Sequence, residues 1–519
     1  MILLCFAFLP MLLWDEGPQT AAVLEKAGIK EIATTRDASG WSGTSVKARS
    51  VDAASLIKLS LPSVDYQAGR ASATAAPWVK SNLSRLLREP GKSFVYDVSG
   101  PAVPLAIAEA ESVGATAYFR IKPEDLSAFR KSAAMAMELE AGPSLPSRAN
   151  FGFVDDGTPT MNELLNLLVR RNLLFDIIHS PADFKGTVVE AGSKEYLAKI
   201  AADPYVFASE VRSRIGDENR LVRLYGSETT LARLYGDGRH SRLHLIQYGR
   251  NPVSALRVRV LGQYHRILIT SLGSRVTVAE DIVVDKTSTE FTVPDLKTYA
   301  VVDLDAGEPA VMKSAFSYGD FELTANPAAT HWKSASVTRM PIDVFGVKLL
   351  LAAAEVRSLW TRDSLYLLYS LPYQTLTLKP SPVIDKETPQ LWNWDVAEAF
   401  IGADEKNIGQ YREYQVSPQG EWVDLDIDVA NPKPGGGMPW NSGFTVKARV
   451  DEANKVWYGE MRIPLSSITS TPLKPGDRLR LGLFGFTGPS ANRTLIAWQP
   501  SFRRNFHVPE AFGSLLLTK

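Results

Sequence analysis

The stretch EWVDLDIDV, residues 421–429, shows the pattern that decides the fold of the C-terminal part of this chain. Apolar residues alternate in it with aspartates, which is typical of an extended strand with one apolar and one acidic face. Residues 364–371, SLYLLYSL, form a nearly continuous apolar run, and PKPGGG at 432–437 predicts a long flexible turn. We therefore expect residues 310–519 to be built mainly of β-strands.

Tryptophan is concentrated in the same segment. Eight of the eleven tryptophans lie beyond residue 311: Trp332, Trp360, Trp392, Trp394, Trp422, Trp440, Trp457 and Trp498. A tryptophan either fills the core of a sandwich or offers a ring on which the apolar face of a sugar stacks. Core packing is the commoner role. Trp392, Trp394 and Trp440, however, stand beside Asn, Pro or Gly in expected loops, which favours a surface role for these three.

Four motifs in this segment resemble those of family 9 carbohydrate-binding modules. In chain order they are WNWDVAEAFI at 392–401, YQVSPQGEW at 414–422, WYGEMRIP at 457–464, and WQP at 498–500 followed by NFHVPEAFG at 505–513. They occur in the family's order across the whole segment. The resemblance implies that residues 310–519 form a carbohydrate-binding β-sandwich.

The resemblance also implies a ligand-binding site. In the family, two aromatic rings enclose the terminal sugar and polar side chains bind its hydroxyl groups. The first motif places Trp392 and Glu398 at such positions. The last motif offers Phe506 as the second ring, with Asn505 and Trp498 nearby, although the family has a tryptophan where Phe506 stands.

Two of these implied roles have alternatives. Glu398 could instead be a strand-end acid paired with an arginine such as Arg503 or Arg504. Family members also carry structural calcium, for which the acidic face of 421–429 offers oxygen ligands; the alternative is a solvated strand face. The candidate calcium ligands are Asp424, Asp426 and Asp428. No other cofactor is expected.

Residues 216–306 read as a separate all-β domain. Leu256, Val258 and Val260 alternate with more polar residues, and turn signals at 251–252 and 273–274 separate short strands. This pattern predicts a small β-sandwich. Residues 305–309, DAGEP, are the expected linker to the C-terminal module.

Residues 23–215 alternate helical and strand patterns. KSFVYDV at 92–98, a helical segment ending at Gly114, and ATAYFRI at 115–121 make a strand–helix–strand unit, which predicts a parallel sheet. We expect one flavodoxin-like α/β domain here. Its order of elements weakly resembles the glutamine-amidotransferase-like domain, but that chemistry needs a nucleophilic cysteine, and the single Cys5 stands at the extreme N-terminus.

One acidic stretch in the α/β region is a candidate catalytic site. Asp155 and Asp156 follow the strand at 150–154, and Glu163 lies in the next helix. Ligands of parallel sheets bind at the carboxyl ends of strands, and a glycosidase needs two carboxylates about 5–10 Å apart. The alternative is ordinary turn and helix-capping chemistry.

The N-terminus reads MILLCFAFLPMLLW over residues 1–14. The run is too short for a membrane-spanning helix and fits a secretory signal peptide, residues 1–22, cleaved near Ala21-Ala22. The alternatives are a buried first strand or a misassigned start. Cleavage would remove Cys5 and leave a thiol-free chain, which suits a secreted or periplasmic protein without a membrane span.

Composition excludes several classes of protein. The 57 basic and 57 acidic residues cancel, so a nucleic-acid partner is not expected. One cysteine excludes a disulfide scaffold and a thiolate metal cluster.

Three functions remain, and we favour the first. It is an extracytoplasmic protein that binds a polysaccharide or oligosaccharide in the service of carbohydrate breakdown. The second is a glycoside hydrolase with its active site in the α/β domain and the module for targeting. The third is a non-catalytic interaction protein whose module has lost sugar binding.

Overall fold

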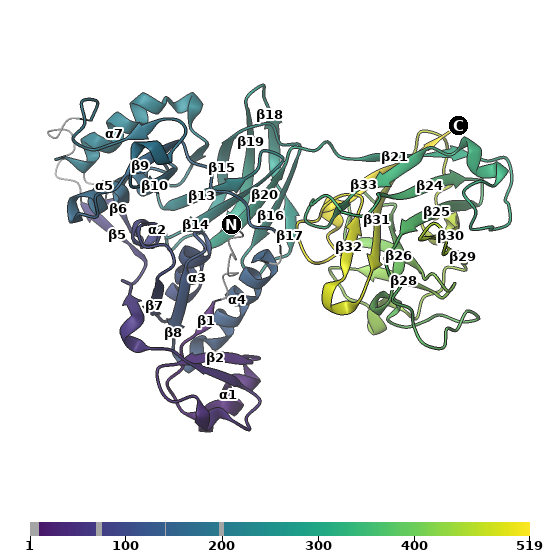
Figure 1. Ribbon diagram of the computed structural model, residues 1–519. Coiled ribbons are helices and arrows are strands. Elements are labelled where there is room, and N and C mark those ends of the chain that lie inside the picture. Colours follow the sequence, from purple (N-terminus) through teal and green to yellow (C-terminus); the bar gives the residue numbers. More distant parts are fainter. Residues whose placement is uncertain (1–9, 69–74, 141, 197–201) are drawn as a thin grey trace. The chain divides into compact units, whose positions relative to one another are not determined.

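The computed structural model describes residues 10–68, 75–140, 142–196 and 202–519 (Figure 1). The chain divides into two compact units, Met1–Gly307 and Glu308–Lys519. The division falls inside the segment 305–309 that the sequence indicates as a linker. No helix in the described ranges is long and apolar enough to cross a membrane.

The first unit starts with parallel strands. Four form a sheet in the order β1 (Met11–Leu12), β8 (Thr116–Arg120), β7 (Ser93–Asp97) and β4 (Leu56–Lys58). A parallel bridge from Leu13 to Ala33 links β1 to the parallel pair β2 (Glu31–Thr34) and β3 (Lys47–Ser50). The accompanying helices are α1 (Ala21–Lys26), α2 (Leu83–Arg88), α3 (Ala102–Glu111) and α4 (Leu126–Glu140).

The predicted strand–helix–strand unit is confirmed as β7, α3 and β8. Gly114 ends it with a φ of 62°, a left-handed conformation that glycine adopts without strain. The strand order, however, is not the 2-1-3-4-5 order of flavodoxin-like sheets. The region therefore has the expected α/β character, while the flavodoxin-like assignment is not confirmed.

A second, smaller parallel sheet replaces the single sheet expected for residues 23–215. Its order is β10 (Phe175–Ile178), β9 (Phe151–Val154) and β11 (Val188–Val189), with helices α5 (Pro159–Arg170) and α7 (Pro204–Ile215) nearby in the chain. An antiparallel hairpin, β5 (Ser63–Ala68) and β6 (Ala75–Lys80), precedes α2. The two sheets are separate because their buried side chains join different apolar cores.

The described chain begins with a buried strand that lies inside residues 1–22, the expected signal peptide. Met11 and Leu12 pair in parallel with Tyr118 and Phe119 of β8, and Leu12, Leu13 and Trp14 are buried. Cleavage near Ala21 would remove this strand and its apolar side chains from the core. The structure therefore favours the alternative, a buried first strand, for residues 11–14. Cys5 lies outside the described residues.

Residues 222–305 form the β-sandwich that the sequence predicts. One sheet has the order β12 (Val222–Tyr225), β15 (Val253–Leu261), β19 (Ser288–Leu296) and β18 (Glu280–Val284). The other has the order β13 (Thr230–Gly236), β14 (His240–Gln247), β20 (Tyr299–Asp305), β16 (Arg266–Ser271) and β17 (Val276–Val278). Leu256, Val258 and Val260 point into the core between them.

The sandwich is not a compact unit of its own. The outer face of its five-stranded sheet contributes Ile246, Tyr248 and Tyr299 to the same apolar core as Phe151 and Phe153 of β9. Hydrophobic burial therefore continues from the α/β region into the sandwich, which explains why both belong to one unit.

The second unit is a sandwich made from one continuous, strongly curved set of strands. The main path runs β28 (Trp422–Asp428), β27 (Gln410–Val416), β26 (Val396–Gly402), β31 (Arg478–Thr487), β33 (Gly513–Thr518), β21 (Val311–Phe316), β24 (Ala354–Trp360), β25 (Ser364–Pro372), β30 (Val456–Pro464) and β29 (Thr445–Asp451). Three short strands join at its sides: β22 (Val337–Met340), β23 (Ile342–Asp343) and β32 (Thr494–Ala497). The main core contains Trp360, Trp457 and Trp498.

Candidate functional site

Strand β26 carries Glu398 at the centre of one sheet face of the second unit. Ala397, Ala399 and Ile401 of this strand point into the main core, so Glu398 points to the opposite face. The residue directly across on β27 is Gln415, and the residue across on β31 is Phe484. Glu398, only 2% exposed, is thus a carboxyl group buried within a largely apolar surface.

Strand β27 adds two more buried polar side chains to this face, Glu413 and Gln415. The Gln415 amide donates a hydrogen bond to Oε1 of Glu413. Three oxygens are buried without a hydrogen-bond partner among the described residues: Oε1 of Glu398, Oε2 of Glu413 and Oε1 of Gln415. Because an unpaired buried polar atom costs about 1–3 kcal/mol, three together are a costly arrangement that points to a ligand or to a proton held between the acids.

The two acids share this environment. Burial raises the pKa of Glu413 to about 8. Burial, and then the neighbouring charge of Glu413, raise the pKa of Glu398 well above its usual range. The pair therefore holds protons at neutral pH and can both donate and accept hydrogen bonds.

Arg493 binds the loop that carries Trp392. Its Nη1 donates to the Trp392 carbonyl at 2.6 Å and its Nη2 donates to the Asn393 carbonyl. Its charge also lowers the pKa of Glu398, against the larger effect of burial. Trp392 belongs to a short 3₁₀ turn, Leu391–Asn393, and is half-buried against an apolar cluster that includes Val396. Trp392 and Glu398, paired in the sequence prediction, therefore belong to one local assembly.

Phe506 is not the open second ring that the resemblance implies. It is 5% exposed and stacks on Phe484 and Phe486, with ring centroids 4.3 and 4.7 Å apart. The guanidinium of Arg493 covers the ring of Phe486 at 5.1 Å. Phe506 therefore helps to build the floor of the site, because packing on two rings leaves its own ring little surface to offer a sugar.

The residues on either side of Phe506 are better exposed. Asn505 is exposed, and its Oδ1 accepts a hydrogen bond from the backbone nitrogen of His507 at 2.9 Å. The His507 ring bonds to the Tyr411 hydroxyl at 2.7 Å, and its Nε2 lies 3.8 Å from Oε2 of Glu413. Asn505 thus orders the segment that covers Glu413.

Trp498 is corrected from a ligand-binding residue to a core residue. It is 8% exposed and belongs to the main core. A side chain at Gly513 would approach its ring within 2.7 Å, so the glycine at that position is needed for the ring to fit.

The acidic face of β28 does not fit a calcium site. Both carboxylate oxygens of Asp426 contact cations, one Arg412 and the other Lys433. Asp428 accepts bonds from the backbone nitrogens of Ala430 and Asn431, each at 2.9 Å. Asp424, the third candidate, has one oxygen bonded to Ser442. In the part of the chain that the structure describes, no group of three or more metal-binding side chains occurs. These aspartates are also buried, so the solvated-face alternative is equally wrong.

The acids of the α/β region have the structural roles given as the alternative to catalysis, namely turn formation and helix capping. Asp155 forms a two-pronged ion pair with Arg88, at 2.8 and 2.9 Å. Asp156 accepts a hydrogen bond from the backbone nitrogen of Thr158, the N-cap of α5, and this bond lowers the pKa of Asp156. Glu163 is exposed on α5. The two aspartates do line a cavity of about 660 Å³, but a carboxylate neutralised by arginine and one with a lowered pKa are poor general acids.

Sequence reasoning missed Glu413, Gln415 and Arg493. Glu413 and Gln415 are two residues apart on β27, the strand beside the one that carries Glu398. They can be assigned to the same face as Glu398 only when the register of the two strands is known. Arg493 gives no signal, because it lies 95 residues from Glu398 in sequence and its contact depends on the fold. The sequence prediction named Arg503 or Arg504 as a partner of Glu398; the arginine whose charge lowers the pKa of Glu398 is Arg493.

The second unit is thus a β-sandwich module with buried carboxyl groups and a half-buried tryptophan on one sheet face. Residues 327–519 match the model of the family described as "Carbohydrate family 9 binding domain-like". This segment is a family 9-like carbohydrate-binding module, which confirms the resemblance for the C-terminal part of the chain. No match for the chain was found among curated proteins.

Solved structures with similarity to the chain include two of a family 9 module from Caldicellulosiruptor kristjanssonii. The one in complex with cellotriose is 15% identical over 40% of this chain and 94% of that one, with a TM-score of 0.31. The one in complex with glucose is 16% identical over 40% and 95%, with a TM-score of 0.29. An alpha-L-fucosidase isoenzyme 2 from Paenibacillus thiaminolyticus is 10% identical over 42% of this chain and 61% of that one, with a TM-score of 0.33.

Proposed function

We propose that the C-terminal module binds a neutral saccharide, in an extracytoplasmic protein that serves polysaccharide breakdown. The observation that carries the proposal is the group of buried, unpartnered oxygens of Glu398, Glu413 and Gln415 beneath the Trp392 loop. The family match of residues 327–519 gives independent support for the ligand class.

The charge state of the site suits a neutral sugar. With raised pKa values, the acid pair carries less negative charge near pH 7 than two free carboxylates would. Protonated carboxyl groups donate and accept hydrogen bonds, as sugar hydroxyl groups do. The positive charge of Arg493 lies next to them and limits the net charge further.

Because Glu398 and Glu413 are almost fully covered, the first contacts of a ligand are with the rim of the site. The rim consists of Trp392, Asn393, Arg493 and Asn505, of which Asn393 and Asn505 are exposed. A half-buried indole gives the apolar face of a pyranose a rigid surface, and the amides are available for its hydroxyl groups. The site thus has one stacking ring instead of the two expected.

The test is calorimetric titration of the full chain with cello-oligosaccharides and xylo-oligosaccharides. We expect Trp392→Ala to weaken binding at least about tenfold, which corresponds to about 1.4 kcal/mol. Trp440→Ala is the matched control, since Trp440 is also half-buried in the module but packs on Arg412 and Tyr414. Equal binding by both variants and the wild type would refute the proposed site.

The same preparations test the hydrolase alternative. Release of reducing sugar from these polymers that disappears in Asp155→Asn would place an active site in the first unit. We expect no such activity, because Arg88 holds Asp155 in an ion pair.

A further inference from the structure

The first unit contains a cavity of about 640 Å³ with an unusual concentration of positive charge. Its walls come from β6, the end of α5, α7, β12 and the turn after β12. The charged side chains that line it are five arginines and one glutamate: Arg170, Arg171, Arg212, Arg220, Arg223 and Glu228. In a chain whose charges cancel overall, such a local excess attracts anions.

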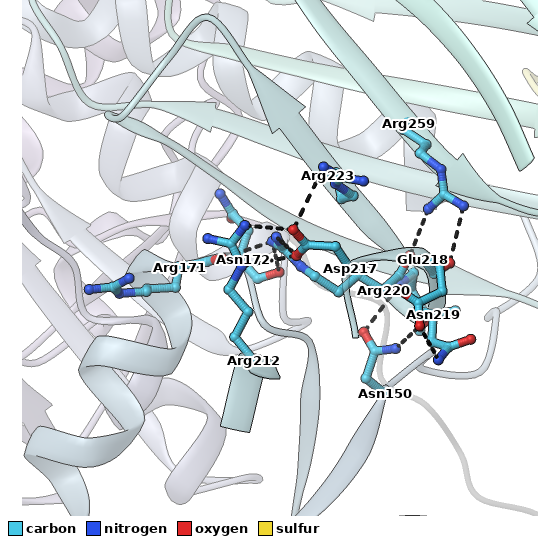
Figure 2. Close-up of polar contacts among 11 residues, drawn as sticks. Asn150, Arg171, Asn172, Arg212, Asp217, Glu218, Asn219, Arg220, Arg223 and Arg259 are labelled. Carbon is cyan, nitrogen blue, oxygen red and sulfur yellow. Dashed lines mark hydrogen bonds and ion pairs between the residues drawn. The ribbon is translucent and has the colours of Figure 1, made fainter. Parts of the chain in front are cut away.

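Three of the arginines share a single carboxylate, that of Asp217 (Figure 2). Arg212 holds both of its oxygens, with distances of 2.9 and 2.8 Å. Arg220 is 3.3 Å and Arg223 3.8 Å from Asp217. Hydrogen bonds from Arg212 hold the pKa of Asp217 well below its usual range. One carboxylate cannot neutralise three guanidinium groups, so positive charge remains at the cavity.

The other two arginines have no acidic partner among the described residues. Arg170 lies over the Trp78 ring at 3.6 Å and donates from Nε to the Val79 carbonyl at 2.7 Å, while its buried Nη1 has no hydrogen-bond partner in the described chain. The guanidinium of Arg171 points away from Asp217 (Figure 2). Both side chains are therefore available to an anion that enters the cavity.

The backbone around Asp217 is held in place before any ligand binds. Arg259 donates to the carbonyls of Glu218 and Arg220, at 3.1 and 3.4 Å. Arg220 in turn donates to the carbonyls of Arg171 and Asn172, at 3.0 and 3.3 Å (Figure 2). These bonds tie the end of α5 to the start of β12, so the arginines are preorganised, which reduces the cost of binding.

Aromatic surface lies beside the charge. Trp78 and Tyr205 are neighbours, with ring centroids 6.2 Å apart, and Tyr225 also lines the cavity. Tyr205 is 49% and Tyr225 38% exposed. Exposed rings next to guanidinium groups suit a ligand that has both an apolar ring face and an anionic substituent.

We propose that this cavity binds an acidic saccharide, with the arginines holding its carboxylate or sulfate group and the tyrosines contacting its ring. The saccharide part of this proposal rests on the carbohydrate-related function proposed above; the anion part rests only on the arginines. The site is separate in sequence and in structural unit from the one around Glu398.

The test is calorimetric titration of the full chain with oligogalacturonate, sulfated oligosaccharide, inorganic sulfate and a neutral cello-oligosaccharide. We expect an acidic oligosaccharide to bind, more weakly at high ionic strength. The double variant Arg171→Gln, Arg223→Gln should weaken this binding at least about tenfold, the scale of losing charged hydrogen bonds. The control Arg250→Gln removes one exposed arginine of the same unit and should change nothing.

Two of the variants named above separate this proposal from the previous one. Trp392→Ala should weaken neutral-sugar binding and leave acidic-sugar binding intact, whereas the double arginine variant should do the reverse. Absence of acidic-saccharide binding, or binding that the double variant does not weaken, would overturn the proposal. Binding of inorganic sulfate as tight as that of the oligosaccharides would overturn the assignment to a saccharide.

Discussion

Each structural unit contains a glutamate that is almost completely buried, but the two carboxyl groups differ greatly in their hydrogen-bond partners. In the first unit, Glu109 accepts hydrogen bonds from Ser81, the Asn82 backbone and side chain, Tyr96 and Tyr248. In the second unit, Oε1 of Glu398 has no hydrogen-bond partner in the described chain. Burial raises the pKa of both.

The difference shows that a raised pKa alone does not identify a binding site. Glu109 joins α3 to β7 and to the residues that directly follow β6 and β14. Its role is structural, because its oxygens accept hydrogen bonds from the protein itself. Glu398 and Glu413 keep hydrogen-bonding capacity that the surrounding protein does not use. It is this unused capacity, in a module of a carbohydrate-binding family, that supports a ligand role.

The largest expected effect is a loss of stability when Glu109, the fully hydrogen-bonded acid, is replaced. Glu109→Ala leaves the hydroxyl groups of Tyr96 and Tyr248 and the donors of Asn82 buried without their acceptor. We expect the first unit to lose about 3–5 kcal/mol of stability. Differential scanning calorimetry of the full chain measures this as a lower melting temperature of one transition. Glu163→Ala, at an exposed position, is the control, and an equal effect in both variants would contradict the role of Glu109.

The next effect is the pH dependence of stability that arises from the buried pair Glu398 and Glu413. The pKa of Glu413 is about 8 in the folded module against an ordinary value of 4.5, so between these values the folded state keeps a proton that the unfolded state loses. Stability is therefore fully present below about pH 4.5 and falls as pH rises to about 8, by at most about 1.4 kcal/mol per pH unit.

The measurement is the urea midpoint of the second unit between pH 5 and pH 8. Glu413→Gln removes the titrating group, so its stability should vary less over this range. A wild-type module that becomes more stable as pH rises would show that the acid pair is ionised in the folded state.

A third, smaller effect tests the link between the acids and the rim. Arg493→Gln removes the hydrogen bonds to the carbonyls of Trp392 and Asn393. We expect saccharide binding to weaken about five- to tenfold, with a stability loss of about 1 kcal/mol. Titration calorimetry and thermal unfolding measure the two separately. Arg478→Gln, on an exposed position of β31, should match the wild type; unchanged binding by Arg493→Gln would remove Arg493 from the site.

The smallest effect is expected at Asn505. Asn505→Ala removes the acceptor for the backbone nitrogen of His507, which should cost about 0.5–1 kcal/mol of the stability of the module. Asn505→Asp keeps an acceptor and should lie closer to the wild type in thermal unfolding. Equal melting temperatures for Asn505→Ala and Asn505→Asp would contradict the role of the Asn505 oxygen as an acceptor.

Local patterns in the sequence predict individual elements well. The alternation in 421–429 gives β28, and the run 92–121 gives β7, α3 and β8, because in both cases the apolar period matches the local geometry. The family motifs identify the C-terminal module. The sequence also marks Trp392 and Glu398; Arg493 binds the Trp392 carbonyl, and its charge lowers the pKa of Glu398.

Features that depend on distant contacts were not predictable. An apolar run such as MLLW at 11–14 fits a signal peptide and a buried strand equally, and its pairing with β8 involves residues far along the chain. The burial of Phe506 depends on Phe484 and Phe486, which lie on β31. Likewise, Asp426 resembles a calcium ligand until Arg412 and Lys433 are seen to occupy its two oxygens.

The pairing of β21 with β33 has a consequence for how such a module can be combined with other proteins. Val311 pairs with Ser514 and Ala315 with Thr518, in parallel, so the first and last strands of the module are neighbours in one sheet. Because the two strands run in the same direction, the chain enters the pair at Val311 and reaches Thr518 at the opposite end, about 13 Å further along. The second unit is therefore suited to fusion at a terminus, whereas insertion into a host loop would need a linker that spans this distance.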